Sequence, residues 1–323
     1  MSLTFDQLIA RLHSQHTRRR IAVACPHDEH TRHVIVRSLQ EGIADFTLVV
    51  DEAHRTSAEE LQQQYPGRVG VHMAEDTVDA ARKAVALVHR GEANVLMKGT
   101  LNTDVLLRAV LNKEEGLLPA GRVLSHVTVA QLPTYHKLLL FSDAAVVPRP
   151  RVSHFEAMLE YDLEVCRRLG IDEPQVALIH CTEKINGKFP HTLGYVILKE
   201  RARKGQYGRV QIDGPMDAKT ACDPHSGQVK GIESTVVGNA DLLIFPNIES
   251  SNTFYKAISL FGQACMAGML TGTTAPVVLP SRADSDDSKY YSLVLACTMA
   301  GGEAPAILES TIVIYRAYSN YSL

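Results

Sequence analysis

The stretch Asn94–Leu111, NVLMKGTLNTDVLLRAVL, contains the unit that decides the fold. Asn94–Met97 is predicted to be a buried strand, and Lys98-Gly99 ends it. Thr103–Leu111 has the apolar spacing of an amphipathic helix. A strand followed at once by a helix is the repeating element of α/β proteins.

The same unit recurs on the N-terminal side of this stretch. Predicted strands are Ile21–Cys25, Phe46–Val50 and Val69–Met73, and predicted helices are Asp28–Glu41, Ala58–Gln64 and Asp76–His89. This alternation predicts a doubly wound, mostly parallel sheet.

On the C-terminal side the alternation is first interrupted and then resumes. Two extended runs, Val123–Leu132 and Leu138–Val147, flank Pro133 and suggest a hairpin-like pair, and Pro148–Arg151 then breaks regular structure. The later strands are Val176–Ile179, Val210–Ile212, Leu242–Phe245, Val277–Leu279 and Ile312–Tyr318, and the later helices are His154–Leu169, Thr192–Lys204, Ser251–Leu270 and Tyr290–Met299.

The length of 323 residues favours two domains, because single cores stop growing near 250–300 residues. We expect one α/β domain from residues 1–152 and 271–323, and a second from residues 153–270. The formal net charge of −3 gives no electrostatic case for a nucleic-acid or membrane partner. Six scattered cysteines without a zinc-type spacing, and an N-terminus unlike a signal peptide, favour a reduced, cytoplasmic protein.

Three predicted strands end in polar clusters: Lys98-Gly99-Thr100, Asn247-Ile248-Glu249 and Ser281-Arg282. Ligands of such sheets bind beyond the carboxyl ends of the strands, so these clusters predict the site. The sequence has no P-loop, dinucleotide fingerprint or hydrolase elbow. The polar run His27–His33 is assigned to helix capping, and no metal site is predicted.

Residues 281–287, SRADSDD, carry chemistry suited to acyl transfer. Arginine binds phosphate oxygens in a planar fork, a hydroxyl can donate to an oxyanion, and a carboxylate can accept a proton. Asp284 and Asp287 compete for the role of base, with Asp286 behind them. The alternative for this segment alone is a capped helix with a solvent-facing arginine.

Taken together, these motifs resemble the phosphate acetyl/butyryltransferase family over nearly the whole chain. The resemblance is carried by residues 95–99 with Thr103 and Arg108, by 124–127, by 199–205 with 213–215, by 230–256, and by 281–285 with Lys289. Asp28-Glu29-His30 after the first strand fits the butyryl branch. Two stretches depart from that branch: Met216–Lys219 and Glu249–Asn252.

The resemblance implies the reaction of a short-chain acyl-CoA with phosphate to give an acyl phosphate and CoA, by direct thiolate attack without a covalent enzyme intermediate. CoA is then a substrate, and no bound cofactor or metal is implied. The butyryl reaction is favoured and the acetyl reaction is the alternative. A dehydrogenase of the same fold and a CoA-binding regulatory module without turnover are the rival hypotheses.

The resemblance also implies a fold similar to the isocitrate and isopropylmalate dehydrogenases, with the site in an interdomain cleft, and a homodimer or a multiple of dimers. It places Ser281 and Arg282 at the reaction centre, and Arg108 on the phosphate. The further residues expected to bind phosphate or the acyl group are Lys98, Thr103, Ser125, Asn247, Glu249, Asn252 and Arg149, with Arg151 as an alternative to Arg149.

Overall fold

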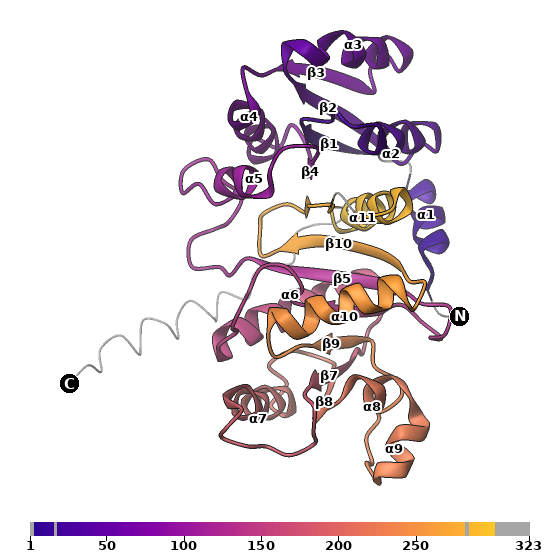
Figure 1. The fold of residues 1–323 in the computed structure, drawn as a ribbon, viewed down its shortest axis with the longest axis vertical. Helices are drawn as coiled ribbons and strands as arrows, with labels where there is room; N and C mark the ends of the chain where they lie inside the picture. The colour runs from indigo at the N-terminus through magenta and orange to yellow at the C-terminus, as the bar shows by residue number, and fades with distance from the viewer. Residues whose placement is uncertain (1–2, 16–17, 282–283, 301–323) are drawn as a thin grey trace, which may run out of the picture.

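The computed structural model describes residues 3–15, 18–281 and 284–300. Within these residues the chain forms an eleven-stranded sheet in the order β3-β2-β1-β4-β11-β10-β5-β6-β9-β7-β8. Seven of the ten strand pairings are parallel. Helices cover both faces of the sheet (Figure 1), so the predicted α/β class with a mostly parallel sheet is confirmed.

The N-terminal part follows the predicted alternation of strands and helices. Its parallel strands are β1 (Arg19–Ala24), β2 (Ala44–Val50), β3 (Val69–Met73) and β4 (Val95–Lys98). Its helices are α1 (Phe5–Ser14), α2 (Glu29–Gln40), α3 (Arg55–Gln64), α4 (Thr77–His89) and α5 (Thr103–Val110), with the 3-10 turn η1 (Glu52–His54) before α3. Asp28 and Asp76 begin α2 and α4 by accepting hydrogen bonds from backbone amides of the first turn.

The strands at the middle of the sheet are antiparallel. β5 (Ser125–Gln131) pairs with both β6 (Leu139–Ser142) and β10 (Cys265–Thr271), which confirms the hairpin-like pair. The prediction of one helix over Ser251–Leu270 is wrong, because α10 (Ile248–Leu260) ends and β10 follows. Alanine, methionine and leucine in β10 favour helix in isolation, and pairing with β5 overrides that preference.

The remaining elements complete the second half of the sheet. They are α6 (Val152–Arg168), β7 (Gln175–Ile179), α7 (Pro190–Arg203), β8 (Gln211–Met216), α8 (Ala218–Cys222), α9 (Pro224–Lys230), β9 (Leu242–Ile244), β11 (Val277–Val278) and α11 (Asp286–Met299). The short helices α8 and α9 were not predicted, and the strand predicted at Ile312–Tyr318 lies outside the described residues. No helix in the described part of the chain is long and apolar enough to cross a membrane.

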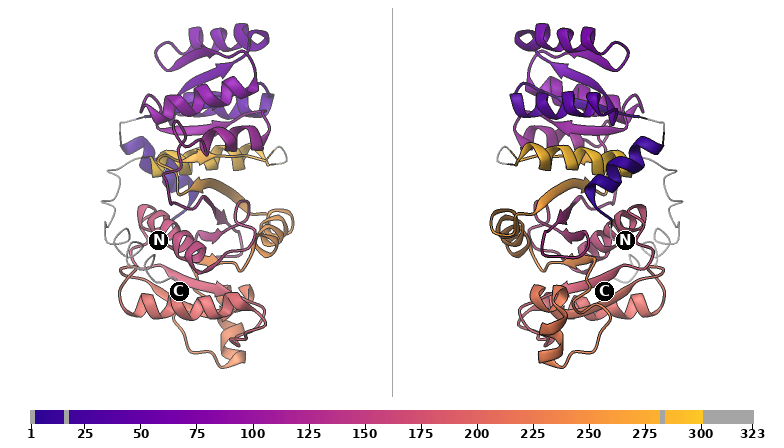
Figure 2. Two further views of the ribbon diagram at one scale, coloured as in Figure 1. Left: turned by 90° about the vertical axis from the view of Figure 1, so that its left-hand side faces the viewer. Right: turned by 90° about the vertical axis from the view of Figure 1, so that its right-hand side faces the viewer.

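The apolar core differs between the two faces of the sheet. On one face a single cluster extends from Phe46 in β2 to Tyr195 in α7. On the other face one cluster lies under α4 and α5, and a separate cluster lies under α10. Leu140 and Phe141, successive residues of β6, belong to clusters on opposite faces, as strand geometry requires. Figure 2 shows α6 and α10 on opposite sides of the sheet.

The predicted division into two domains does not coincide with a gap in the sheet. β5 and β6 precede residue 152, yet they pair with β10 and β9, which lie in the other predicted domain. Strand pairing continues through all eleven strands. The division at residues 152 and 271 therefore stays a prediction.

Candidate active site

The loop between β11 and α11 holds Ser281 and Asp284 in contact. One carboxylate oxygen of Asp284 accepts a hydrogen bond from the Ser281 backbone amide at 2.7 Å, and the other accepts one from the Tyr255 hydroxyl at 3.1 Å. Ser285 then begins α11 by accepting a backbone hydrogen bond from its first turn. Asp284 therefore has a fixed orientation beside Ser281. Arg282 lies outside the described residues.

A buried carboxylate, Asp143, organises the neighbouring ends of β5 and β6. One of its oxygens accepts hydrogen bonds from the Ser125 hydroxyl at 2.8 Å and the His126 backbone amide at 3.0 Å. The other accepts the backbone amides of Ala145 and Val146, each at 2.8 Å. These donors supply the partners that a buried polar group requires, and they fix the predicted site residue Ser125 in place.

The imidazole of His126 lies near enough to Asp143 and Asp284 to feel the charge of both carboxylates. Burial lowers the pKa of His126, and the negative charges of Asp143 and Asp284 only partly oppose this effect. The ring is therefore neutral near pH 7 and can accept a proton or a hydrogen bond. A Cβ atom at Gly268 would lie 2.8 Å from two ring atoms, so the glycine leaves room for the imidazole.

The start of α10 contacts the segment that follows β6. Asn247 begins the helix by accepting a backbone hydrogen bond from its first turn. Asn252 donates its side-chain amide to the Ala144 carbonyl oxygen at 2.9 Å. Glu249 is exposed in the first turn of α10, and Arg149 is exposed on the segment after β6. These predicted residues are thus brought to the segment that carries Asp143.

Lys98, Thr103 and Arg108 form a second group, on β4 and α5. Lys98 is 4% exposed, and its ammonium group donates to the carbonyl oxygens of Gly99 and Leu101 at 3.0 and 3.3 Å. Its charge therefore stabilises the loop after β4. Thr103 and Arg108 are exposed on α5, and 83% of the Arg108 side chain is accessible to solvent. Arg108 can therefore meet an anion.

The two acids of the first turn of α11 contact another helix. Asp287 accepts a hydrogen bond from Arg37 at 2.8 Å, and Asp286 pairs with His30 at the same distance. Arg37 and His30 both belong to α2. The structure therefore separates the two candidate bases, because Asp284 contacts Ser281 whereas Asp287 joins α11 to α2.

Three residues beside Ser281 and Ser125 were not among the predicted site residues: Asp143, His126 and Tyr255. Asp143 directly follows the apolar strand β6, and this position at a strand end was a usable signal in the sequence. Tyr255 gives no comparable signal, because it reaches Asp284 only through the packing of α10 across the sheet.

A cavity in the second half of the sheet does not coincide with this chemistry. It has a volume of about 470 Å³ and lies between α7 and β8, where Lys199 and Asp213 form an ion pair at 2.6 Å. β8 is six strands away from β11 in the sheet. The arrangement of Ser281, Asp284 and His126 is therefore the better guide to the site.

Comparisons of the sequence and of the structure with known proteins all point to one protein family. The family described as Phosphate acetyl/butaryl transferase matches residues 62–297. The chain is 34% identical to a phosphate butyryltransferase of Clostridium acetobutylicum, over 94% of this chain and all of that protein. It is 32% identical to a phosphate acetyltransferase of Thermotoga maritima, over 87% of this chain and 95% of that protein. A branched-chain phosphotransacylase from Enterococcus faecalis V583 has a similar structure, with a TM-score of 0.78 and 28% identity, covering 88% of this chain and all of that chain.

Proposed function

Because this chain belongs to the Phosphate acetyl/butaryl transferase family, we propose that it transfers a short acyl group between CoA and inorganic phosphate. The reaction is acyl-CoA plus phosphate giving acyl phosphate plus CoA. CoA is a substrate of such a reaction and not a bound cofactor. The contact between Ser281 and Asp284 is the observation on which the proposed location of the active site rests.

In the direction of thioester formation, the thiol of CoA attacks the carbonyl carbon of an acyl phosphate. Asp284 takes the thiol proton as the carbon–sulfur bond forms. The Ser281 hydroxyl donates to the oxyanion that develops on the carbonyl oxygen. The carbon–oxygen bond to phosphate then breaks, and phosphate leaves with the bonding electrons. Arg282 and Arg108 balance its negative charge.

Asp284 is a better candidate for the base than Asp287. The backbone amide of Ser281 orients one oxygen of Asp284 and the Tyr255 hydroxyl orients the other. Asp287 instead accepts a hydrogen bond from Arg37, with which it forms an ion pair. A base must lie within hydrogen-bond reach of the proton that it removes, so proximity to the proposed oxyanion donor Ser281 favours Asp284.

We infer that the substrates bind in an interdomain cleft between α5 and α10. The apolar core is divided on this face of the sheet, with one cluster under α5 and another under α10. The strand residues Thr128 and Gly268 face this side, and His126 lies beside them. Small and polar residues are unusual on a covered sheet face, which supports a ligand at this position. A fold similar to the isocitrate and isopropylmalate dehydrogenases remains part of this proposal.

Both departures from the butyryl branch have structural roles in this chain. Asp217 begins α8 by accepting from the Thr220 amide at 2.8 Å and pairs with Lys230. Ser250 supplies the amide that Asn247 caps, whereas the hydroxyl of Ser251 is buried without a hydrogen-bond partner among the described residues. The contacts of Asp217 and Ser250 support an active enzyme over a binding module without turnover.

We also propose a homodimer, or a multiple of dimers, in the cytoplasm. α7 exposes an apolar stripe, in which Phe189, Leu193 and Val196 are 42%, 50% and 44% exposed. These residues are spaced by four and three positions and therefore lie on one side of the helix. An exposed stripe of this kind supports a protein interface. All six cysteines are unpaired, which supports a reducing compartment.

The test is CoA release from a panel of acyl-CoAs with and without phosphate. Arg282→Ala should lose most of the phosphate-dependent release, because the loss of one charge-stabilising donor typically costs roughly 10²–10³ in turnover. Arg209→Ala is the matched control, since Arg209 pairs with Glu173 at the exposed edge of β8. If phosphate does not increase CoA release from an acyl-CoA of any acyl-chain length, the transferase proposal fails. A CoA-binding module without turnover is then the better explanation.

A further inference from the structure

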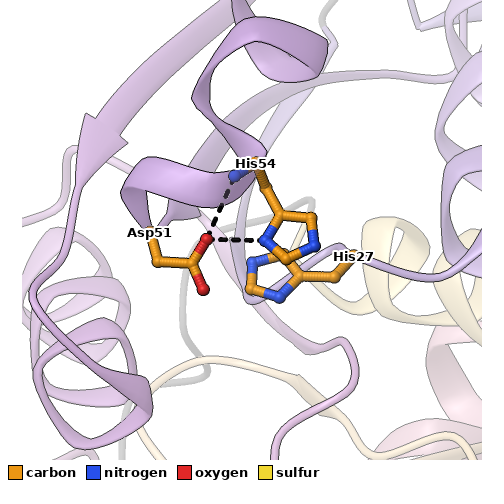
Figure 3. A group of neighbouring side chains, drawn as sticks. All are labelled: His27, Asp51 and His54. Carbon is orange, nitrogen blue, oxygen red and sulfur yellow. Dashed lines mark hydrogen bonds and ion pairs between the residues drawn. The ribbon is translucent and has the colours of Figure 1, made fainter.

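Three side chains meet beyond the carboxyl ends of β1 and β2, outside the proposed acyl-transfer site. His27 lies just after β1, Asp51 directly follows β2, and His54 ends η1. Each offers one nitrogen or oxygen atom that lies within 4.8 Å of those of the other two. Figure 3 shows the two imidazole rings beside the Asp51 carboxylate.

The backbone around these residues fixes the cluster. Asp51 begins η1 by accepting a hydrogen bond from the His54 amide at 3.1 Å, and the same oxygen lies 2.6 Å from His54 Nδ1. The backbone amide of His27 donates to the Cys25 carbonyl oxygen at 2.9 Å. The His27 ring stacks on the His54 ring with centroids 3.6 Å apart and planes within 6°.

One buried nitrogen atom of the cluster lacks a hydrogen-bond partner in the described structure. Nε2 of His27 is buried and has no hydrogen bond within the described residues, although buried polar atoms are usually paired. A cavity of about 220 Å³ is bounded in part by His27, His54 and Ser57. The cluster thus contains a buried nitrogen without a hydrogen-bond partner in the part of the chain that the structure describes, and its two histidines border a cavity.

We propose that His27, Asp51 and His54 form a binding site for a divalent transition-metal ion of the zinc type. Two imidazoles and one carboxylate suit Zn²⁺, whereas Mg²⁺ and Ca²⁺ prefer oxygen ligands alone. The ion replaces the proton that His54 and Asp51 share. The ligand atoms then move to about 3.4 Å apart, as bond lengths of about 2.1 Å in a tetrahedron require, and the two rings turn out of their stack, because an imidazole nitrogen binds an ion in the plane of its ring. A water from the cavity can fill the fourth position.

Such an ion links two loops that the sequence separates. It joins the loop between β1 and α2 to the turn after β2. The helix α2 is in turn joined to α11 through His30–Asp286 and Arg37–Asp287, at 2.8 Å each. Metal binding therefore stabilises the part of the fold that supports the start of α11.

The test is titration of the full chain with Zn²⁺ alone, followed by calorimetry and by the thermal unfolding midpoint, with Mg²⁺ as the control ion. A Cys181→Ser background removes the exposed thiol, which could bind zinc by itself. We expect one Zn²⁺ per chain and a raised midpoint. His27→Ala and His54→Ala should weaken binding by about 100-fold or more, since the loss of an outer-sphere partner already costs about 10- to 100-fold.

His33→Ala is the matched control, because His33 is exposed on α2 and lies outside the cluster. It should bind Zn²⁺ as the parent does. If alanine variants fail to fold by circular dichroism, His54→Gln takes their place, since the His54 side chain is 40% exposed. The proposal is overturned if the parent binds no Zn²⁺, if His33→Ala loses as much affinity as His54→Ala, or if a Co²⁺ derivative shows thiolate ligation. None of these readouts depends on acyl transfer.

Discussion

Replacement of Asp284 by asparagine tests the assignment of the base. Asp284 accepts hydrogen bonds from the Ser281 amide and the Tyr255 hydroxyl. Asparagine keeps the size and one acceptor oxygen, but its amide group faces the other donor and cannot take a proton. We expect turnover at pH 7 to fall about 10²- to 10⁴-fold, the usual contribution of a general base. The free energy of unfolding should fall by only about 1–3 kcal/mol.

The loss of activity should shrink as the pH rises, because the thiol of CoA then ionises without help. With a thiol pKa near 8.5, the thiolate fraction grows from about 3% at pH 7 to about 75% at pH 9. Thioester formation by Asp284→Asn should therefore rise about 25-fold over this interval. The assay follows the thioester formed from an acyl phosphate and CoA, with circular dichroism to confirm folding.

Asp287→Asn provides the comparison. Its partner Arg37 keeps a hydrogen bond to Glu41 at 2.9 Å and a contact with the Tyr290 ring. The Asp287 side chain is 64% exposed, so loss of its ion pair should cost only about 0.2–1 kcal/mol of stability. Turnover should change little. If Asp287→Asn abolished turnover and Asp284→Asn retained it, the assignment of the base would be refuted.

Three further substitutions test the surroundings of the site and one ion pair. Tyr255→Phe should lower turnover by roughly tenfold in the same assay, because a hydrogen bond to a charged group contributes about 1.5–3 kcal/mol; unchanged turnover would count against the proposed base. Gly268→Ala should displace the His126 ring and reduce turnover by roughly 10²-fold, as a misplacement of about 1 Å can, with a smaller change in the thermal midpoint; a loss of folding alone would contradict a role for the ring. Asp79→Asn should lower stability in urea at pH 7 but not near pH 2. The hydrogen bond from Lys83 lowers the pKa of Asp79 to about 2, so this stabilisation is present above the ordinary pKa near 3.9 and is lost as the pH falls through 2; an equal loss at both pH values would contradict it.

The predicted strands of the fold were right wherever apolar runs alternated with capped helices. The first four strands and the helices between them follow this rule, and Asp28 and Asp76 cap as expected. The error at β10 has a local cause, because CMAGMLT contains no β-branched residue except its last. Only its pairing with β5, more than 130 residues earlier, makes it a strand. Such a pairing is invisible to local periodicity.

Those residues of the candidate site that directly follow a strand in the sequence could be predicted. Ser281 and Asp284 are close in sequence and in space, so their partnership could be anticipated. The cluster of His27, Asp51 and His54 could not be predicted, because its members come from two separate loops. The polar run after β1 also contains histidines that lie outside the cluster. In that run Asp28 caps α2 and His30 pairs with Asp286, so only His27 joins the cluster.

The acidic residues after Ser281 have two different roles, one in the proposed reaction and one in holding helix α11. Asp284 precedes the first turn of α11 and contacts Ser281, whereas Asp286 and Asp287 lie within that turn and contact α2. The loop that carries Ser281 is therefore anchored at one end by the pairing of β11 with β4, and at the other by two ion pairs to a separate helix. Catalytic groups must be held within about 0.5 Å of their productive positions, and rigid elements on both sides of a short loop provide this precision. The two acids that do not take the proton thus anchor the helix that follows Asp284, and because Asp286 keeps its contact with His30, loss of the Asp287 ion pair alone should leave Asp284 in place.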